Sequence, residues 1–189
     1  MIAEVDRNGW PILVAERLLY SDMIIRSFIA SKDFNDIKNW ITDEREHAMW
    51  CANLIGFPME KDNFARVMQD AAERCGDSPY VVTSDKGELI GFFCYSVNVD
   101  SNEGMFKFVM NNPQYRGKGY GKEMLRLAVK YAFENTNVQT VQLNVFPENE
   151  RAKKCYESVG FTERKTDLNA FVYKDESWGR CNMVIRRGW

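Results

Sequence analysis

The spacing of hydrophobic residues predicts helices in the first part of the chain. From residue 33 to residue 76, apolar residues recur every three or four positions, which is the period of an amphipathic helix. Asp33 and Asp62 are predicted N-caps, and Gly76 is a predicted helix stop. The pattern predicts a strand over 22–30, followed by helices over 33–41, 44–54 and 62–76.

The second part of the chain alternates between strand and helix patterns. Apolar and polar residues alternate in the strand segments, whereas 122–134 carries an apolar stripe on one helical face. The order of elements predicts a single domain over 1–189 of the mixed α/β (α+β) class, with residues 1–20 as an N-terminal extension. The predicted strands are 80–84, 89–99, 105–110, 138–146, 162–173 and 180–187, with helices over 122–134 and 149–161 and a turn over 174–179.

Composition and charge exclude several classes of protein. Hydrophobic residues make up 45% of the chain and the net charge is −2, which is ordinary for a globular domain and gives no general attraction to nucleic acid or to anionic membranes. No apolar run approaches the roughly 20 residues that span a bilayer. The five cysteines form no CxxC pair and there is one histidine, so we expect neither a metal site nor a disulfide framework. These features predict a reduced, cytoplasmic protein.

A glycine-rich basic turn precedes the helix predicted over 122–134. In the sequence QYRGKGYGKEM, Gly117, Gly119 and Gly121 occupy every second position, with the basic residues Arg116, Lys118 and Lys122 between and around them. A strand that ends in such a turn and enters a helix exposes backbone N–H groups at the positive end of the helix dipole, where phosphate oxygens bind. Neither the dinucleotide fingerprint nor the P-loop fits, because Lys122 stands where the third glycine belongs and Glu123 follows it. A tight turn without a ligand is the alternative.

Two separated motifs resemble those of the GNAT superfamily of acyl-CoA-dependent N-acyltransferases. Residues 116–121, RGKGYG, are similar to its R/Q-x-x-G-x-G/A signature, and the order of elements is similar over 22–187. The resemblance implies a mostly antiparallel sheet with helices on both faces and a V-shaped split between two parallel strands, 105–110 and 138–146. The branch with ribosomal-protein N-terminal and polyamine acetyltransferases is the most similar. The second motif consists of Leu143, Val145, Asn149, Ala152, Tyr156, Gly160 and Phe161.

The resemblance implies acetyl transfer from acetyl-CoA to a primary amine, without a metal. It places the pyrophosphate on the glycine turn and the pantetheine arm along the strand 105–110. A backbone N–H of Val109 or Met110 would stabilise the oxyanion. The implied cofactor-binding residues are Phe108, Val109, Met110, Arg116, Gly117, Lys118, Gly119, Tyr120, Gly121, Lys122, Asn149 and Tyr156.

The same resemblance gives candidate catalytic residues. Tyr156 stands at the position of the general acid that protonates the leaving thiolate, although its place on an apolar stripe also suits a core residue. Phe106 stands where many relatives carry a glutamate base. Glu103 is the remaining candidate base, with a solvated loop acid and a water chain as the alternatives.

The sequence indicates the residues that bind the acceptor less specifically than those that bind the cofactor. His47 lies among charged residues, so a solvated or capping role is expected for it. The acceptor is expected to be a small-molecule or peptide amine, and the protein a monomer or a homodimer. A transferase for a longer acyl-CoA and a weakly catalytic acyl-CoA sensor are the alternatives. Candidate residues for the acceptor pocket are Trp40, Trp50, Phe57 and Tyr95, and acids that could attract a cationic acceptor are Asp43, Glu44 and Glu46.

Overall fold

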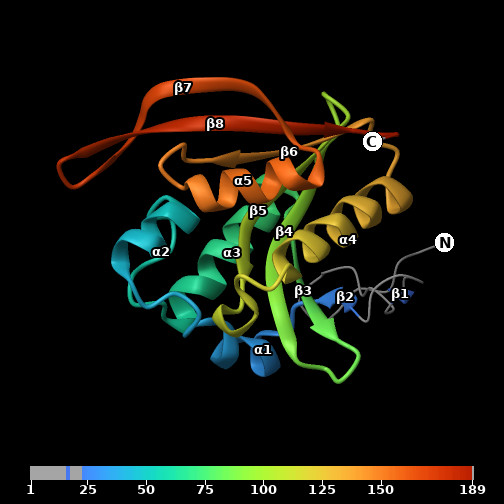
Figure 1. The fold of residues 1–189 in the computed structure, drawn as a ribbon. Coiled ribbons are helices and arrows are strands. Elements are labelled where there is room, and N and C mark those ends of the chain that lie inside the picture. The colour runs from blue at the N-terminus through green and yellow to red at the C-terminus, as the bar shows by residue number, and fades with distance from the viewer. Residues whose placement is uncertain (1–15, 18–22, 189) are drawn as a thin grey trace.

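One mixed sheet runs through the molecule (Figure 1), which we describe from a computed structural model over residues 16–17 and 23–188. Its eight strands follow the order β1-β2-β3-β4-β5-β6-β8-β7. Neighbours are antiparallel except for β5 and β6, which are parallel. The predicted extension over 1–20 lies outside the described residues, apart from β1. The strands are β1 Glu16–Arg17, β2 Met23–Ser27, β3 Ser78–Ser84, β4 Leu89–Asn98, β5 Glu103–Asn111, β6 Thr140–Val145, β7 Thr162–Tyr173 and β8 Glu176–Arg186.

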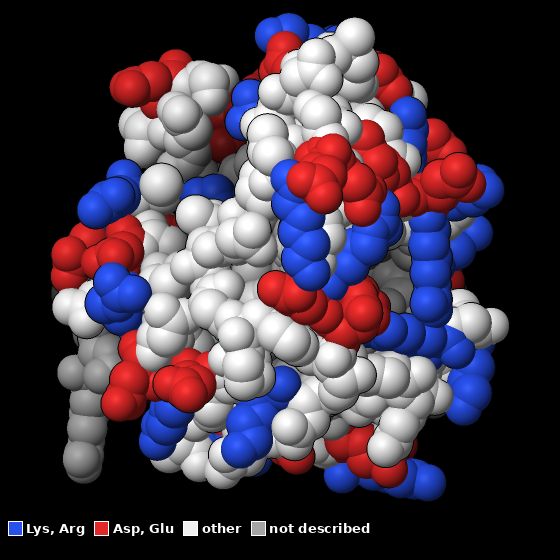
Figure 2. Space-filling view, turned by 90° about the vertical axis from the view of Figure 1, so that its left-hand side faces the viewer, with Lys and Arg blue, Asp and Glu red and all other residues white. Residues whose placement is uncertain are grey.

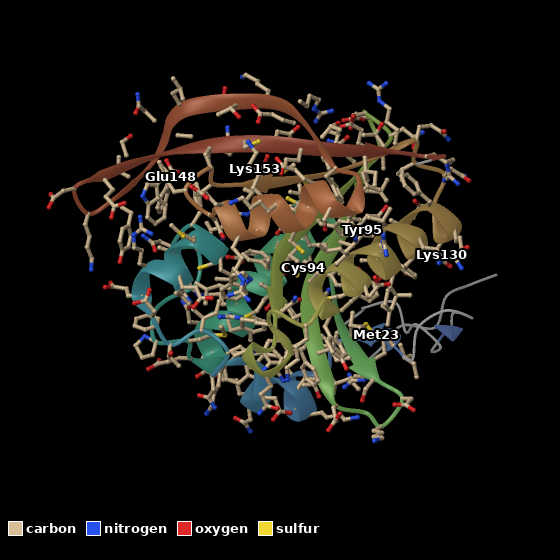
Figure 3. All side chains as sticks on the ribbon, viewed as in Figure 1. Met23, Cys94, Tyr95, Lys130, Glu148 and Lys153 are labelled. Carbon is tan, nitrogen blue, oxygen red and sulfur yellow. The ribbon has the colours of Figure 1, made fainter. Side chains whose placement is uncertain are left out.

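Helices cover both faces of the sheet, which confirms the predicted fold class (Figure 1). Successive residues of a central strand show this: Cys94 packs with the core under α1 and α3, and Tyr95 packs with the core under α4 and α5 (Figure 3). Among the described residues no helix has the length and apolarity needed to span a membrane. The helices are α1 Ala30–Ile37, α2 Glu44–Cys51, α3 Lys61–Cys75, α4 Tyr120–Asn135 and α5 Glu150–Val159, with the 3₁₀ turn η1 Pro113–Tyr115.

Both predicted aspartate N-caps lie inside their helices. The N-cap positions are Ile29 for α1 and Glu60 for α3. Asp33 stands in the first turn of α1, where its carboxylate accepts from the Ile29 N–H at 2.8 Å and pairs with Arg26 at 2.7 Å. Asp33 therefore still satisfies a free N–H at the start of the helix, but it does so from within the helix, so α1 begins three residues earlier than predicted.

The last two strands are joined by a shorter turn than predicted. Tyr173 pairs directly with Glu176, which leaves only Lys174 and Asp175 between the strands. Lys174 has a φ of 51°, the positive value that a two-residue hairpin turn requires. The hairpin tip contacts α2, because Lys174 pairs with Glu44 and Glu176 pairs with Arg45.

The pairing of β5 with β6 ends halfway along β5. The parallel register runs from Glu103–Thr140 to Phe106–Leu143, whereas β5 continues to Asn111. A bulge lies just beyond this point, because the register with β4 shifts between Phe92 and Cys94, and Phe108 has a φ of 52°. The two strands therefore separate at Phe106, as the predicted V-shaped split requires.

Candidate active site

A cavity of about 400 Å³ opens where β5 and β6 separate. Its walls are the end of β5, the end of β6, the glycine turn, the first turn of α4, α5 and one face of α2. Of the predicted cofactor-binding residues, ten line it: Phe108, Val109, Met110, Arg116, Gly117, Gly119, Gly121, Lys122, Asn149 and Tyr156. The fold thus brings most of the predicted site residues to one place.

The glycine turn presents unused N–H groups to this cavity. Gly117 and Gly119 have φ values of 74° and 86°, which favour glycine, and Gly119 is the N-cap of α4. The first N–H groups bonded within α4 are those of Lys122 and Glu123, both to the Gly119 carbonyl. The N–H groups of Gly117 and Gly119 find no partner among the described residues. The turn is therefore suited to phosphate oxygens, as is expected of a glycine-rich helix start.

Arg116 differs from the glycines that follow it. Its N–H already donates to the Pro113 carbonyl at 3.2 Å, so its backbone is not available to a ligand. Its side chain forms an ion pair with Glu46 of α2 at 2.7 Å and donates to the Trp40 carbonyl at 3.3 Å. Arg116 therefore offers its guanidinium to the cavity, and this guanidinium is shared with α2.

Two predicted cofactor residues of the turn lie outside the cavity wall. Lys118 is exposed. Tyr120 packs its ring on Tyr115, with centroids 4.9 Å apart, and so holds η1 against the start of α4. Both residues shape the turn or its surroundings without lining the cavity.

Tyr156 lies on the buried face of α5, packs edge-on against Phe161 and lines the cavity. Burial, and secondarily the neighbouring Cys155, raises the pKa of the Tyr156 hydroxyl well above its usual value. The hydroxyl therefore keeps its proton at neutral pH and is available as a donor. Burial also raises the pKa of Cys155, although Arg151 and Lys122 oppose this effect.

Glu103 lies at the other end of β5 and does not line the cavity. Its carboxylate accepts from Arg164 and from Gln142, both at 2.7 Å. The Gln142 side chain accepts in turn from Asn182, which also donates to the Asn144 side chain at the cavity wall. Glu103 therefore anchors a polar network on β6 and β8, and contacts the cavity only through amide side chains.

His47 does not have the solvated position that its charged neighbours suggest. It is 1% exposed, and its ring lies against Trp50 and Phe57, with centroids 5.5 and 5.3 Å apart. Burial lowers the pKa of His47, and the Cys51 thiol lies 3.6 Å from Nδ1. The prediction was wrong because α2 turns the His47 face toward the core.

The residues proposed for the acceptor pocket separate into two groups. Trp50 and Glu46 line the cavity. Trp40 and Tyr95 are buried in the cores, and Phe57 is 41% exposed beside His47. Asp43 caps α2 through the Glu46 N–H, and Glu44 pairs with Lys174.

Sequence reasoning missed several residues of the wall, including Asn111, Arg151 and Met49. Asn111 is the last residue of β5, and its buried Oδ1 has no partner among the described residues. A Cβ on Gly121 would collide with the Asn111 amide, so this glycine permits the close approach of β5 and α4. The position of Asn111 at the strand end was the signal that could have found it.

The chain matches the Acetyltransferase (GNAT) family over residues 34–161. Because this span is more than half of the chain and includes both motifs, the chain belongs to the GNAT acetyltransferase family. A mycothiol acetyltransferase of Streptomyces avermitilis is 25% identical over 170 residues, covering 87% of this chain and 50% of that protein. The chain spans about half the length of this relative.

Solved structures show the same fold. The spermidine N-acetyltransferase from Vibrio cholerae in complex with CoA and spermine superimposes with a TM-score of 0.72 at 22% identity, covering 87% of this chain and 95% of that chain. The ribosomal-protein-S5-alanine acetyltransferase from Vibrio fischeri gives 0.70 at 16% identity, with 93% and 97% covered. At these identities the two likenesses show that the fold is shared.

Proposed function

We propose that the protein transfers an acetyl group from acetyl-CoA to a primary amine in the cavity between β5 and β6. The observation that carries the proposal is the meeting of unused N–H groups at Gly117 and Gly119 with the open edge of β5 in one cavity. The N–H groups suit the pyrophosphate. The edge of β5 beyond Phe106 has no β6 partner and suits the amides of the pantetheine arm.

The charges of the cavity fit this substrate. Its basic lining residues are Lys107, Arg116, Lys122 and Arg151, which match the phosphates of CoA. Lys107 is already engaged by Asp77 at 2.9 Å, so the other three remain for the phosphates. The bulged backbone at Phe108 lies at the split, and an N–H of Val109 or Met110 would polarise the thioester carbonyl there.

The reaction is a direct attack. The neutral amine attacks the thioester carbonyl carbon, a C–N bond forms, the C–S bond breaks, and the sulfur leaves as a thiolate. The amine arrives protonated, because its pKa is about 10, so it loses one proton before the attack and a second as the bond forms. The Tyr156 hydroxyl donates to the leaving sulfur, and the amine protons pass to water. Holding the two reactants together supplies much of the remaining acceleration.

The test combines acetyl-CoA with a set of amines and measures both free thiol and acetylated product. Thiol release should require the amine, and its rate should rise with pH below the pKa of the amine, about 10. Acylation of alcohols or thiols alone would contradict the proposal. Cofactor binding without any amine-dependent release would favour a sensor.

A further inference from the structure

Glu46 is the one carboxylate among the described residues that line the cavity. Every other charged side chain of that wall is basic, and three of them, Arg116, Lys122 and Arg151, suit the phosphates of the cofactor. The Glu46 side chain is 45% exposed, so a ligand that enters the cavity can reach it. Binding of the negatively charged cofactor does not explain a carboxylate in this basic cavity.

The helix that carries Glu46 is fixed by the tip of the β7–β8 hairpin. Arg45 pairs with Glu176 at 2.6 Å, and Glu44 pairs with Lys174 at 2.8 Å. Figure 2 looks onto the side of the molecule that carries α2 and this hairpin tip, and shows acidic and basic side chains interspersed over it. Because α2 is held from the hairpin side, its opposite face presents Glu46 to the cavity at a set position.

Trp50 follows Glu46 by one helical turn and lines the same wall. Its ring meets that of Phe108 edge-on, with centroids 5.9 Å apart, so it stands next to the split of the sheet. Its Nε1 is buried and has no partner among the described residues. A buried donor without a partner is unfavourable, so this wall is suited to a ligand that accepts a hydrogen bond from the Trp50 N–H.

Arg116 forms an ion pair with Glu46, with the guanidinium and the carboxylate 2.7 Å apart. A pyrophosphate on the glycine turn offers the Arg116 guanidinium a second anionic partner. Glu46 would then be left as a free carboxylate on the cavity wall, about one helical turn from the split. With both substrates bound, Arg116 pairs with the pyrophosphate and Glu46 pairs with a cationic group of the acceptor.

We propose that Glu46 is a specificity residue that binds a second positive charge of the acceptor while the reacting amine lies beside Trp50 and Phe108. The inference rests on the proposed function and names its acceptor class: an amine that carries another cationic group a short distance from the one acetylated. An amine whose second group is neutral gains nothing from Glu46.

The test compares diaminobutane with aminobutanol, which differ only in replacing the second ammonium by a hydroxyl. The wild-type protein should prefer the diamine in kcat/KM by about fivefold, the upper end for a half-exposed charge pair. In Glu46→Gln the ratio should fall to about one, while the kcat/KM for aminobutanol changes little. Added salt should lower the wild-type preference.

The matched control is Glu60→Gln, which removes an exposed carboxylate that makes no side-chain capping bond to α3 and does not line the cavity. This variant should keep the preference for the diamine. The affinity of Glu46→Gln for CoA, measured by thermal shift, should be unchanged or tighter, because the variant releases Arg116. A purely structural ion pair would instead weaken CoA binding when it is lost.

Four results would overturn the inference. They are a wild-type protein without preference for the diamine, a preference that survives in Glu46→Gln, an equal loss of preference in Glu60→Gln, and weaker binding of CoA by Glu46→Gln. If CoA does not stabilise the wild-type protein, or if no amine is acetylated, the proposed function itself fails and the inference fails with it.

Discussion

Phe106 and Phe108 lie two residues apart on β5, yet their side chains pack on opposite faces of the sheet. Regular strand alternation would place both on one face. The bulge at Phe108, with its φ of 52°, inverts the alternation. Phe106 consequently packs between Phe93 and Tyr95, with centroids 5.4 and 5.3 Å away, whereas Phe108 packs against Trp50 in the core on the other face.

The aromatic surroundings of Phe106 predict that a glutamate cannot be placed there. Phe106 is 2% exposed, and Phe106→Glu would bury a carboxyl group among aromatic rings. We expect a loss of about 4 kcal/mol or more in the free energy of unfolding, measured by urea titration. The control Phe106→Leu should lose only about 1–2 kcal/mol. A stable and more active Phe106→Glu protein would show that this position acts as a base site.

Gly119→Val should abolish the stabilisation of the protein by CoA. A β-branched side chain at a φ of 86° strains the N-cap of α4 and covers the N–H groups of the turn. Gly76→Val is the control, because Gly76 has a φ of 68° at the end of α3, outside the cavity. Both variants should lose about 1–2 kcal/mol of stability. Differential scanning fluorimetry should show the CoA shift in Gly76→Val only; a shift in both would mean that the turn holds no phosphate.

Glu103→Gln should reduce kcat by less than about tenfold, which corresponds to about 1.4 kcal/mol. Glu103 is held by Arg164 and Gln142 away from the cavity wall, so no single step of the transfer depends on its charge. Steady-state kinetics with acetyl-CoA and one good amine give the value. A thousandfold loss in a folded variant would identify Glu103 as the base.

The stability of the protein should depend on the protonation of its single histidine. Burial lowers the pKa of His47 from 6.5, so the unfolded chain binds a proton that the folded protein resists. The stability contribution is fully present above pH 6.5 and is lost as the pH falls below it. The melting temperature should therefore fall between about pH 6.5 and 5, and this fall should be smaller in His47→Gln.

Glu163 and Glu176, on the β7–β8 hairpin, do not contribute to the change in stability between about pH 6.5 and 5. Lys153 and Arg45 hold the pKa values of Glu163 and Glu176 at about 2, below their usual 4.5. Those two groups contribute to stability above pH 4.5 and lose the contribution only toward pH 2. An identical pH dependence in the wild-type protein and His47→Gln would show that folding does not shift the pKa of His47.

Much of the fold could be predicted, because its signals are local. The helix stop at Gly76 and the alternation of Val141, Leu143 and Val145 depend only on neighbouring residues, and the structure confirms both. The inversion at Phe108 could not be predicted, since a bulge depends on the register between β4 and β5, which residues far apart in sequence determine.

The same contrast holds for the site. The glycine turn and Tyr156 belong to motifs that can be found in the sequence, and they reach the cavity together. The partners of Glu103 and the burial of His47 depend on contacts across the fold: Arg164 lies on β7, and Phe57 follows the helix that carries His47. A run of charged residues around His47 gave no sign of which face α2 would bury.

Tyr156 is proposed to serve acetyl transfer in the cavity between β5 and β6, and the kcat of Tyr156→Phe decides whether it does. The phenylalanine keeps the ring that packs on Phe161, so folding and the stabilisation by CoA should be unchanged. Loss of the hydroxyl should lower kcat by about a hundredfold or more and leave KM for acetyl-CoA nearly unchanged, as expected for a general acid. A variant that keeps most of the wild-type kcat, with chemistry rate-limiting, would contradict the claim and leave Tyr156 as a residue of the core.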